Sequence, residues 1–266
     1  MIPYAFNYRR ATSLADAEAA LKASPDAKLL AGGQTLIAAM KMRLANPSDL
    51  IDISGIKELN YIRVANGTVS IGAATTHFDV ANSADVKKAI PALAHAASLI
   101  GDPAVRHKGT LGGSVANNDP AADYPAAVLA LGATIKTNTR SIKADDFFTG
   151  MFSTALEEGE IVTEVSFPIP EKAAYQKFPN PASRYAMAGV FVARFKDGIR
   201  VAATGAGPCV FRVPQMEAAL AKSFTPDAVA KIAVDADGLN SDIHGSAEYR
   251  ANLVTVMAKR AVAEAA

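Results

Sequence analysis

The chain has little of several things, and each shortage excludes a class of site. It has one cysteine, Cys209, so it can form no internal disulfide. An iron–sulfur cluster would need about four cysteine ligands, which this chain cannot supply alone. Its histidines show no metal-ligand spacing, so neither a structural nor a catalytic zinc site is expected. The sequence therefore predicts no metal held by this chain.

Net charge and long apolar runs are also lacking. The formal net charge is +1, from 27 basic and 26 acidic residues, which gives no indication of binding to nucleic acid or to a membrane surface. No apolar stretch approaches the roughly 20 residues that cross a bilayer, so no transmembrane segment is expected. The first 13 residues contain no apolar core of a signal peptide. The expected location is the cytoplasm, where a single free cysteine is ordinary.

What the chain does have is length and apolar side chains. Its 266 residues, half of them hydrophobic, are enough for one large domain or two modest ones, at roughly 150 residues per domain. Four prolines fall within residues 168–181, and the main boundary is expected there.

Local patterns predict both helices and strands. Two hairpins are predicted, across the turn dipeptides Asn66-Gly67 and Asp197-Gly198. Strands are predicted over Asp26–Ala31, Asp49–Ile53, Tyr61–Val64, Thr68–Gly72, Thr134–Thr137, Glu160–Phe167, Ala188–Phe195 and Ile199–Gly205. Helices are predicted over Ser13–Ala23, Gln34–Leu44, His77–Ala81, Lys87–Ile100, Ala122–Leu131, Val213–Lys222, Pro226–Val234 and Glu248–Ala266.

Two glycine pairs, Gly32-Gly33 and Gly112-Gly113, each lie between an apolar run and polar or helical residues. Either pair alone is most simply a tight turn that needs a positive φ. The first pair is not followed by the Lys-Ser/Thr of a P-loop, and it has no third glycine at dinucleotide-fold spacing. Side chains with hydroxyl or amide groups flank both pairs: Gln34, Thr35, Thr110 and Ser114. Together the pairs favour a pocket in which exposed backbone N–H groups and neutral side chains hold a pyrophosphate.

Asp123 lies ten residues beyond the second pair. Its carboxylate could accept hydrogen bonds from ribose hydroxyls, or it could be an ordinary acidic residue at a helix N-terminus. No nucleophile, base and orienting group occur in a recognisable set, so no catalytic residue is expected in this chain.

Three stretches together resemble the FAD-binding medium subunit of the molybdenum hydroxylases, the family of xanthine dehydrogenase and aerobic carbon monoxide dehydrogenase. They are AGGQTLIAAMKMR (31–43), GDPAVRHKGTLGGSVANNDPAADYPA (101–126) and FFTGMFSTALEEGEIVTEVSFP (147–168). The resemblance covers essentially the whole chain, in order.

The resemblance implies an α+β fold. A two-subdomain FAD-binding fold of the vanillyl-alcohol-oxidase/PCMH type would be followed by a C-terminal α+β domain with an antiparallel sheet. The implied divisions are 1–56 and 57–172 for the two FAD-binding subdomains, and 173–266 for the C-terminal domain, which is similar to that of the carbon monoxide dehydrogenase flavoprotein.

The resemblance also implies a role as an electron-transfer subunit. FAD in this chain would take electrons from two [2Fe–2S] clusters in a small partner subunit and pass them to an external acceptor. A large partner subunit with a molybdopterin-type cofactor would oxidise the substrate, and the whole would be a dimer of heterotrimers. The single cysteine fits this division of cofactors.

The same resemblance implies a set of site residues. The first pyrophosphate loop would comprise Ala31, Gly32, Gly33, Gln34 and Thr35. The second would comprise Thr110, Leu111, Gly112, Gly113 and Ser114. Many relatives have Ile at the position of Leu111 and Asn at that of Ser114, which leaves the backbone role intact. Asp123 matches the acidic residue after the second loop.

Four further positions are similar to flavin contacts in the family. Ile100 would pack near the flavin, and Ile161 would lie at the edge of its ring, although either could be ordinary core. Tyr185 resembles an aromatic residue that covers the isoalloxazine, or it could belong to a subunit interface. Lys177 matches a flavin-contacting lysine of the xanthine branch, or it could be a solvated loop charge.

Two alternatives remain open from the residues. The first is a stand-alone flavoprotein oxidoreductase on the same fold, which would turn over a substrate without partners. The second is an assembly module that has lost its flavin, which would be colourless and still bind its partners.

Overall fold

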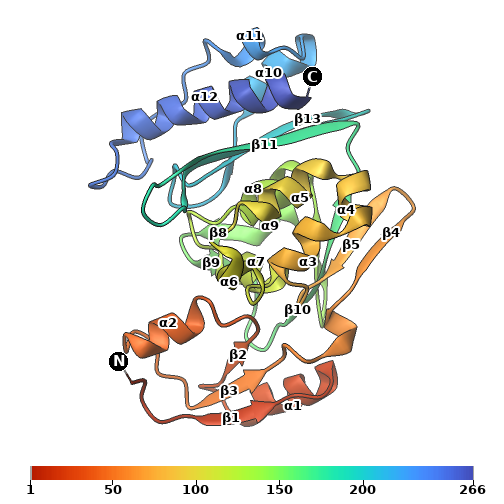
Figure 1. The fold of residues 1–266 in the computed structure, drawn as a ribbon, viewed down its shortest axis with the longest axis vertical. Coiled ribbons are helices and arrows are strands. Elements are labelled where there is room, and N and C mark those ends of the chain that lie inside the picture. The colour runs from red at the N-terminus through yellow and green to blue at the C-terminus, as the bar shows by residue number, and fades with distance from the viewer. Residues whose placement is uncertain (1, 266) are drawn as a thin grey trace.

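The computed structural model describes residues 2–265, which build three stacked layers, each centred on a β-sheet (Figure 1). The N-terminal layer lies at one end, the layer with the second sheet lies in the middle, and the C-terminal layer lies at the other end. This arrangement confirms the predicted α+β class. None of the helices described over residues 2–265 is both long and apolar enough to cross a bilayer.

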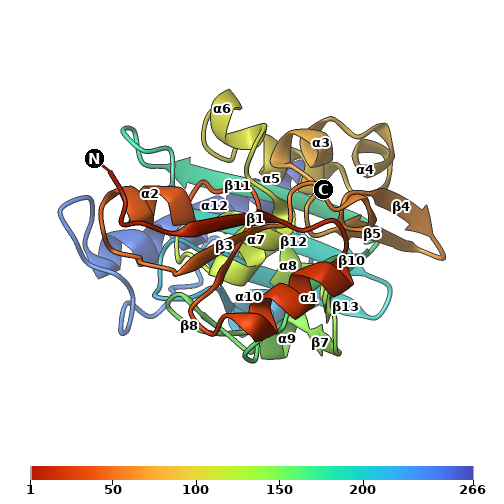
Figure 2. The ribbon, with the colours of Figure 1, turned by 90° about the horizontal axis from the view of Figure 1, so that it is seen from below.

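The first layer holds a parallel sheet in the order β1-β3-β2, seen from below in Figure 2. Its elements are β1 (Asn7–Arg10), α1 (Leu14–Ala23), β2 (Lys28–Leu30), α2 (Leu36–Lys41) and β3 (Asp49–Asp52). Helix α1 begins as predicted, because the Ser13 side chain accepts a hydrogen bond from the Asp16 backbone N–H at 3.2 Å. The predicted start of α2 at Gln34 is wrong. The chain stays irregular through Thr35, which makes no side-chain cap.

The second layer holds an antiparallel sheet in the order β4-β5-β10-β6-β7. The strands are β4 (Ile62–Ala65), β5 (Thr68–Gly72), β6 (Thr134–Thr137), β7 (Ser141–Lys143) and β10 (Val162–Pro168). This layer also contains a 3-10 helix, η1 (Lys57–Leu59), and a short helix, α9 (Ala144–Phe147). Two short strands, β8 (Phe148–Gly150) and β9 (Ser153–Thr154), pair with each other beside it. The predicted hairpin is confirmed: Asn66 and Gly67 have φ angles of 50° and 72°, as a tight hairpin turn requires.

Helices pack beside this sheet and against one another in the middle layer (Figure 1). They are α3 (His77–Asn82), α4 (Ala84–Ala89), α5 (Pro91–Ser98), α6 (Pro103–Arg106), α7 (Leu111–Asn117) and α8 (Tyr124–Ala130). The single helix predicted over Lys87–Ile100 is wrong. It is broken at Ile90, which has φ −141° and ψ 75°, because the residue before a proline is driven out of the helical region.

The third layer holds an antiparallel sheet in the order β11-β12-β13-β14. Its elements are β11 (Lys172–Pro179), β12 (Ala186–Phe195), β13 (Gly198–Thr204), β14 (Phe211–Arg212), α10 (Pro214–Lys222), α11 (Pro226–Val229) and α12 (Ala247–Ala265). The hairpin predicted across Asp197-Gly198 is confirmed, since Phe195 pairs with Gly198. Strand β11 was not predicted, because it runs through the proline-rich segment.

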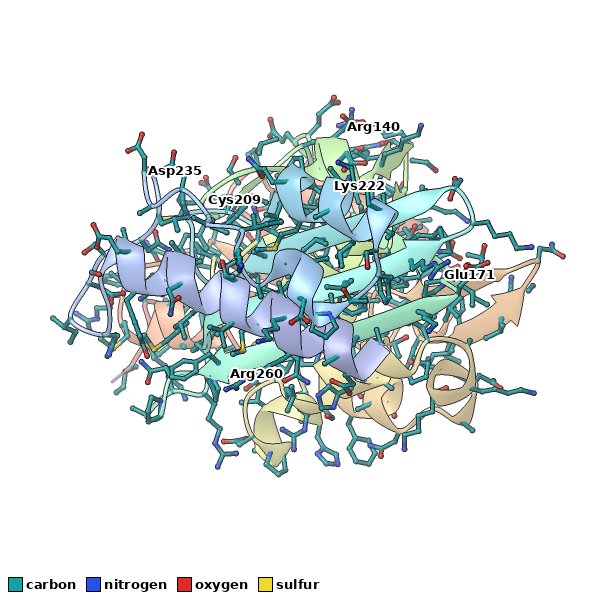
Figure 3. The ribbon with its side chains drawn as sticks, turned by 90° about the horizontal axis from the view of Figure 1, so that it is seen from above. Arg140, Glu171, Cys209, Lys222, Asp235 and Arg260 are labelled. Carbon is teal, nitrogen blue, oxygen red and sulfur yellow. The ribbon has the colours of Figure 1, made fainter. Side chains whose placement is uncertain are left out.

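The third sheet is buried on both faces. Val190 and Val192 of β12 pack into a cluster with α12, which lies across the sheet in Figure 3. Phe191 and Ala193, which alternate with them, pack into the cluster that contains α5 and α8. Tyr175 of β11 also joins this second cluster. The sheet therefore presents one face to the middle layer. The divisions at residues 56/57 and 172/173 stay predictions.

Candidate functional site

The first glycine pair directly follows β2. Gly33 has a φ of 70°, which favours glycine, and a Cβ there would lie 2.6 Å from the Ile37 Cδ1. No backbone or side-chain acceptor among the described residues pairs with the backbone N–H groups of residues 32–35. Gln34 donates from its side chain to the carbonyl oxygen of Gly32 at 3.1 Å. The loop from Ala31 to Thr35 thus offers consecutive unpaired N–H donors, which is what an anion needs.

The second glycine pair uses its N–H groups inside the protein. It forms the first turn of α7, where Gly113 donates to the Thr110 side chain at 3.1 Å. Leu111 and Gly112 donate to the carbonyl oxygens of Thr75 and Ala73, at 3.0 and 2.9 Å. The Ser114 N–H is the next of these donors, and it bonds to the Thr110 carbonyl oxygen at 3.0 Å. The expectation that this pair leaves its N–H groups free is wrong, because strand β5 continues into residues that accept from it.

The structure brings the two pairs together. A Cβ at Gly32 would lie 2.1 Å from the Lys108 carbonyl oxygen and 2.7 Å from the Gly109 Cα. A Cβ at Gly113 would lie 3.8 Å from the Ala31 Cβ. Gly113 is exposed and Ser114 is half-buried. The loop whose N–H groups are unpaired therefore lies against the segment that carries the second pair, of which Gly113 and Ser114 keep exposed surface.

His77 backs this surface from inside. Its backbone N–H donates to the Gly109 carbonyl oxygen at 2.9 Å, and its imidazole is buried against the same glycine. The ring centroid lies 5.3 Å from that of Tyr124. Burial, together with the charge of Arg106, lowers the pKa of His77 to about 4, so the imidazole is neutral at neutral pH.

Asp123 and Lys177 form a buried ion pair between the second and third layers. The Lys177 Nζ lies 3.0 Å from the Asp123 Oδ2, and both side chains are almost completely buried, with exposed fractions of 4% and 5%. Tyr175 donates from its hydroxyl to the Asp123 Oδ1 at 2.6 Å. Burial raises the pKa of the Asp123 carboxyl above its ordinary value, although Lys177 and Tyr175 oppose the shift. Asp123 makes no cap hydrogen bond to its own helix.

The other predicted residues lie in three different surroundings. Ile100 is half-buried beside Leu99, whose carbonyl oxygen accepts from Lys177 at 3.2 Å. Tyr185 is 51% exposed and follows Arg184, which has a φ of 63°. Ile161 is 1% exposed and packs in the core between the first and second layers. Ile100 therefore lies near the ion pair, whereas Ile161 has almost no surface left for a ligand.

Two residues of this region were not predicted. Tyr175 contacts Asp123, and Gly189 gives the Tyr175 hydroxyl its space, because a Cβ at Gly189 would lie 2.3 Å from that oxygen. The sequence held one usable signal. Tyr175 and Lys177 are two residues apart, so in a strand they share a face.

The chain matches two family models that together span nearly its whole length. Residues 4–170 match the FAD binding domain in molybdopterin dehydrogenase, and residues 173–265 match the CO dehydrogenase flavoprotein C-terminal domain. This chain belongs to the family of FAD-binding medium subunits of the molybdenum hydroxylases. The predicted family and fold are confirmed, and the homologous complexes are dehydrogenases, so the chain is an oxidoreductase subunit.

Relatives of several activities are similar over their full lengths. The chain is 38% identical to the glyceraldehyde dehydrogenase medium chain of Sulfolobus acidocaldarius, over 100% of each chain. It is 38% identical to the carbon monoxide dehydrogenase medium chain of Hydrogenophaga pseudoflava, over 98% of this chain and 97% of the relative. Against a solved structure of carbon monoxide dehydrogenase from Hydrogenophaga pseudoflava, the TM-score is 0.90 at 39% identity, with 100% and 98% of the chains covered.

Proposed function

We propose that this chain is the FAD-carrying electron-transfer subunit of a multi-subunit molybdenum hydroxylase. The observation that carries the proposal is the row of unpaired N–H groups at residues 32–35, lying against the second glycine pair. These donors would bind the pyrophosphate of FAD, and the Ser114 hydroxyl would add a further donor from the other side. Membership of a family of FAD-binding subunits supports this assignment.

The adjoining residues fit the remaining parts of FAD. Ile100 would supply an apolar contact for the ring, and Tyr185 is exposed enough to stack on it. The Lys177 ammonium lies near Ile100 and would donate a hydrogen bond to the ring. Asp123 would act through Lys177, since both of its oxygens already accept hydrogen bonds from the protein. The flavin, when bound, supplies the electron-transfer chemistry, and the chain supplies binding and orientation.

Two partner subunits are part of the proposal. One would carry [2Fe–2S] clusters and the other a molybdopterin-type cofactor at which the substrate is oxidised, in a dimer of heterotrimers. The chain's single cysteine supports this, because it cannot ligate a cluster by itself. The medium-chain names of its relatives also support a place in such a complex.

The test follows electrons through the native complex. The tagged chain is purified from the cells that produce it, and the flavin and iron–sulfur absorbances are followed anaerobically after a reductant reaches the partner subunits. Reduction of the clusters followed by the flavin, and reoxidation through an added acceptor, is the expected result. Turnover of a substrate by the chain alone would favour a stand-alone oxidoreductase. A colourless chain that still binds its partners would favour an assembly module.

A further inference from the structure

The buried pair of Asp123 and Lys177 depends on a third side chain from the same strand as the lysine. Tyr175 and Lys177 stand two apart on β11 and point to the same face of the third sheet. The Tyr175 hydroxyl donates to one oxygen of Asp123 and the Lys177 ammonium donates to the other, at 2.6 and 3.0 Å. Each carboxylate oxygen therefore has its own donor, so the carboxylate can adopt one orientation only.

Gly189 makes this geometry possible. It lies in the middle of β12, directly opposite Lys177, and its φ is not in the left-handed region, so backbone freedom does not explain a glycine there. A Cβ at Gly189 would lie 2.3 Å from the Tyr175 hydroxyl oxygen and 3.1 Å from the Thr204 Cγ2. The absence of a side chain at Gly189 leaves room for the Tyr175 hydroxyl, which can then reach Asp123.

Lys177 has one donor more than its protein partners use. An ammonium group has three N–H bonds. Within residues 2–265 the Lys177 Nζ bonds to the Asp123 Oδ2 at 3.0 Å and to the Leu99 carbonyl oxygen at 3.2 Å. The side chain is only 4% exposed, so burying the remaining N–H without an acceptor would be energetically costly. That acceptor would lie beside the Leu99–Ile100 segment.

We propose that Tyr175 and Gly189 are positioning residues for the flavin ring, which rests on the proposed FAD function. Gly189 admits the Tyr175 hydroxyl, the hydroxyl fixes the Asp123 carboxylate, and the carboxylate fixes the Lys177 ammonium. The remaining N–H of Lys177 then donates to an electron-rich oxygen or nitrogen at the edge of the ring. A fixed cation at that place stabilises the ring more strongly when it is reduced, because reduction adds electron density.

The chain contains a matched control for the arrangement of Tyr175, Asp123 and Lys177. Tyr61 donates to Glu164, and the Lys136 Nζ lies 2.6 Å from the Glu164 Oε1, so a tyrosine, a carboxylate and a lysine meet again in the second sheet. Lys136 is 48% exposed, whereas Lys177 is 4% exposed. Burial raises the pKa of Glu164, but the hydrogen bonds from Lys136, Ser166 and Tyr61 outweigh it and bring the value to about 2. Glu164 is therefore ionised with or without a flavin.

The experiment compares Tyr175→Phe with Tyr61→Phe in the flavin-loaded complex. Each loses one hydroxyl donor to a carboxylate. We expect Tyr175→Phe to weaken FAD binding by up to about tenfold, because a less fixed Lys177 ammonium would lose at most the hydrogen bond that it donates to the ring. We also expect it to move the flavin reduction potential to a more negative value, while Tyr61→Phe changes neither quantity. Wild-type affinity and potential in Tyr175→Phe, or equal shifts in the two variants, would overturn the proposal.

Gly189→Ala provides a second test if Tyr175→Phe fails to fold. The added methyl group displaces the hydroxyl, so the potential should move in the same direction, and an unchanged potential would also overturn the proposal. In a protein that already carries Tyr175→Phe, Gly189→Ala should have a smaller effect than it has alone, because the residues act through one contact. A wild-type protein that binds no FAD rejects the proposed function and this inference together. A wild-type protein that binds FAD, with unshifted variants, rejects this inference alone.

Discussion

The two glycine pairs lie against each other, yet their backbone N–H groups are used in opposite ways. In the first pair, Gly32-Gly33, the N–H groups have no acceptor among the described residues. In the second, Gly112-Gly113, the N–H groups bond to Ala73 and Thr110. The same dipeptide is thus a loop open to a ligand in one place and part of the scaffold in the other. The difference arises from the neighbours in space. The continuation of strand β5 supplies acceptors to helix α7, whereas the Lys108-Gly109 segment that lies against Gly32 accepts no hydrogen bond from the N–H groups of residues 32–35 within residues 2–265.

Because of this difference, substitutions in the two pairs should have different effects on stability and on FAD binding. A side chain at Gly32 or at Gly112 would meet backbone and should destabilise the fold, and a side chain in the first pair should in addition weaken FAD binding directly. Four predictions test that contrast.

The largest effect is expected from Gly112→Ala. The new Cβ would lie 2.4 Å from the Ala73 Cβ and 2.8 Å from the Ala73 Cα and carbonyl oxygen, where backbone cannot move aside easily. We expect a loss of about 3 kcal/mol or more in the free energy of unfolding. Gly113→Ala is the control, because its nearest contact is the Thr110 side chain at 2.8 Å. Urea titrations that rank Gly113→Ala as the more damaging change would contradict the assignment.

His77 gives the second pair a pH dependence that the first lacks. Its pKa is lowered by burial from an unfolded value of about 6.5 to about 4. Stability is then full above pH 6.5 and is lost as the pH falls toward 4, because the unfolded chain binds the proton first. The loss should reach about 3 kcal/mol. His77→Leu should flatten this part of the stability profile, and an identical slope in the variant would show that another group is responsible.

Gly32→Ala should affect both the fold and the ligand. A Cβ at Gly32 would meet the Lys108 carbonyl oxygen at 2.1 Å and push the first loop away from the second. Losing one or two hydrogen bonds to a charged phosphate should raise the dissociation constant of FAD about tenfold to a hundredfold. Gly198→Ala is the control, since a Cβ there has no heavy atom within 4 Å. FAD binding of wild-type strength in Gly32→Ala would place the pyrophosphate elsewhere.

The smallest effect is expected from Ser114→Ala. The Ser114 backbone N–H is already used by the Thr110 carbonyl oxygen, so only the hydroxyl is available to a ligand. Loss of this one hydrogen bond to the pyrophosphate should weaken FAD binding by about tenfold or less, with stability unchanged. A loss as large as that of Gly32→Ala, measured in the same titration, would mean that the second pair binds the phosphates as strongly as the first.

Features set by near neighbours in the chain were predictable. The cap of Ser13 on α1 and the hairpin turns at Asn66-Gly67 and Asp197-Gly198 depend on a few consecutive residues. The break before Pro91 is equally local, and the helix predicted across it ignored a signal that was present. Three stretches together, 31–43, 101–126 and 147–168, were also enough to identify the family.

The features that were missed depend on partners far along the chain. The Gly112 N–H has its acceptor at Ala73, just beyond β5 and about 40 residues earlier, and no local pattern shows that this donor is used. Asp123 was considered for a ribose contact or as a charge at a helix N-terminus, and neither interpretation included its hydrogen-bond partners Tyr175 and Lys177, which come from a strand about 50 residues later. Gly189 is a glycine because of a phenol from another strand. The roles of Ala31, Ile161 and Tyr185 toward the flavin stay predictions.

The central claim is that the first glycine pair holds the pyrophosphate of FAD. The most direct measurement is the absorption spectrum of the purified wild-type chain in its complex, with the released cofactor identified by mass and counted per chain. A flavin spectrum with close to one FAD per wild-type chain, with less FAD retained in Gly32→Ala and wild-type content in Gly198→Ala, is the predicted result. A colourless protein that cannot be reconstituted with FAD would contradict the claim and leave both pairs as structural turns.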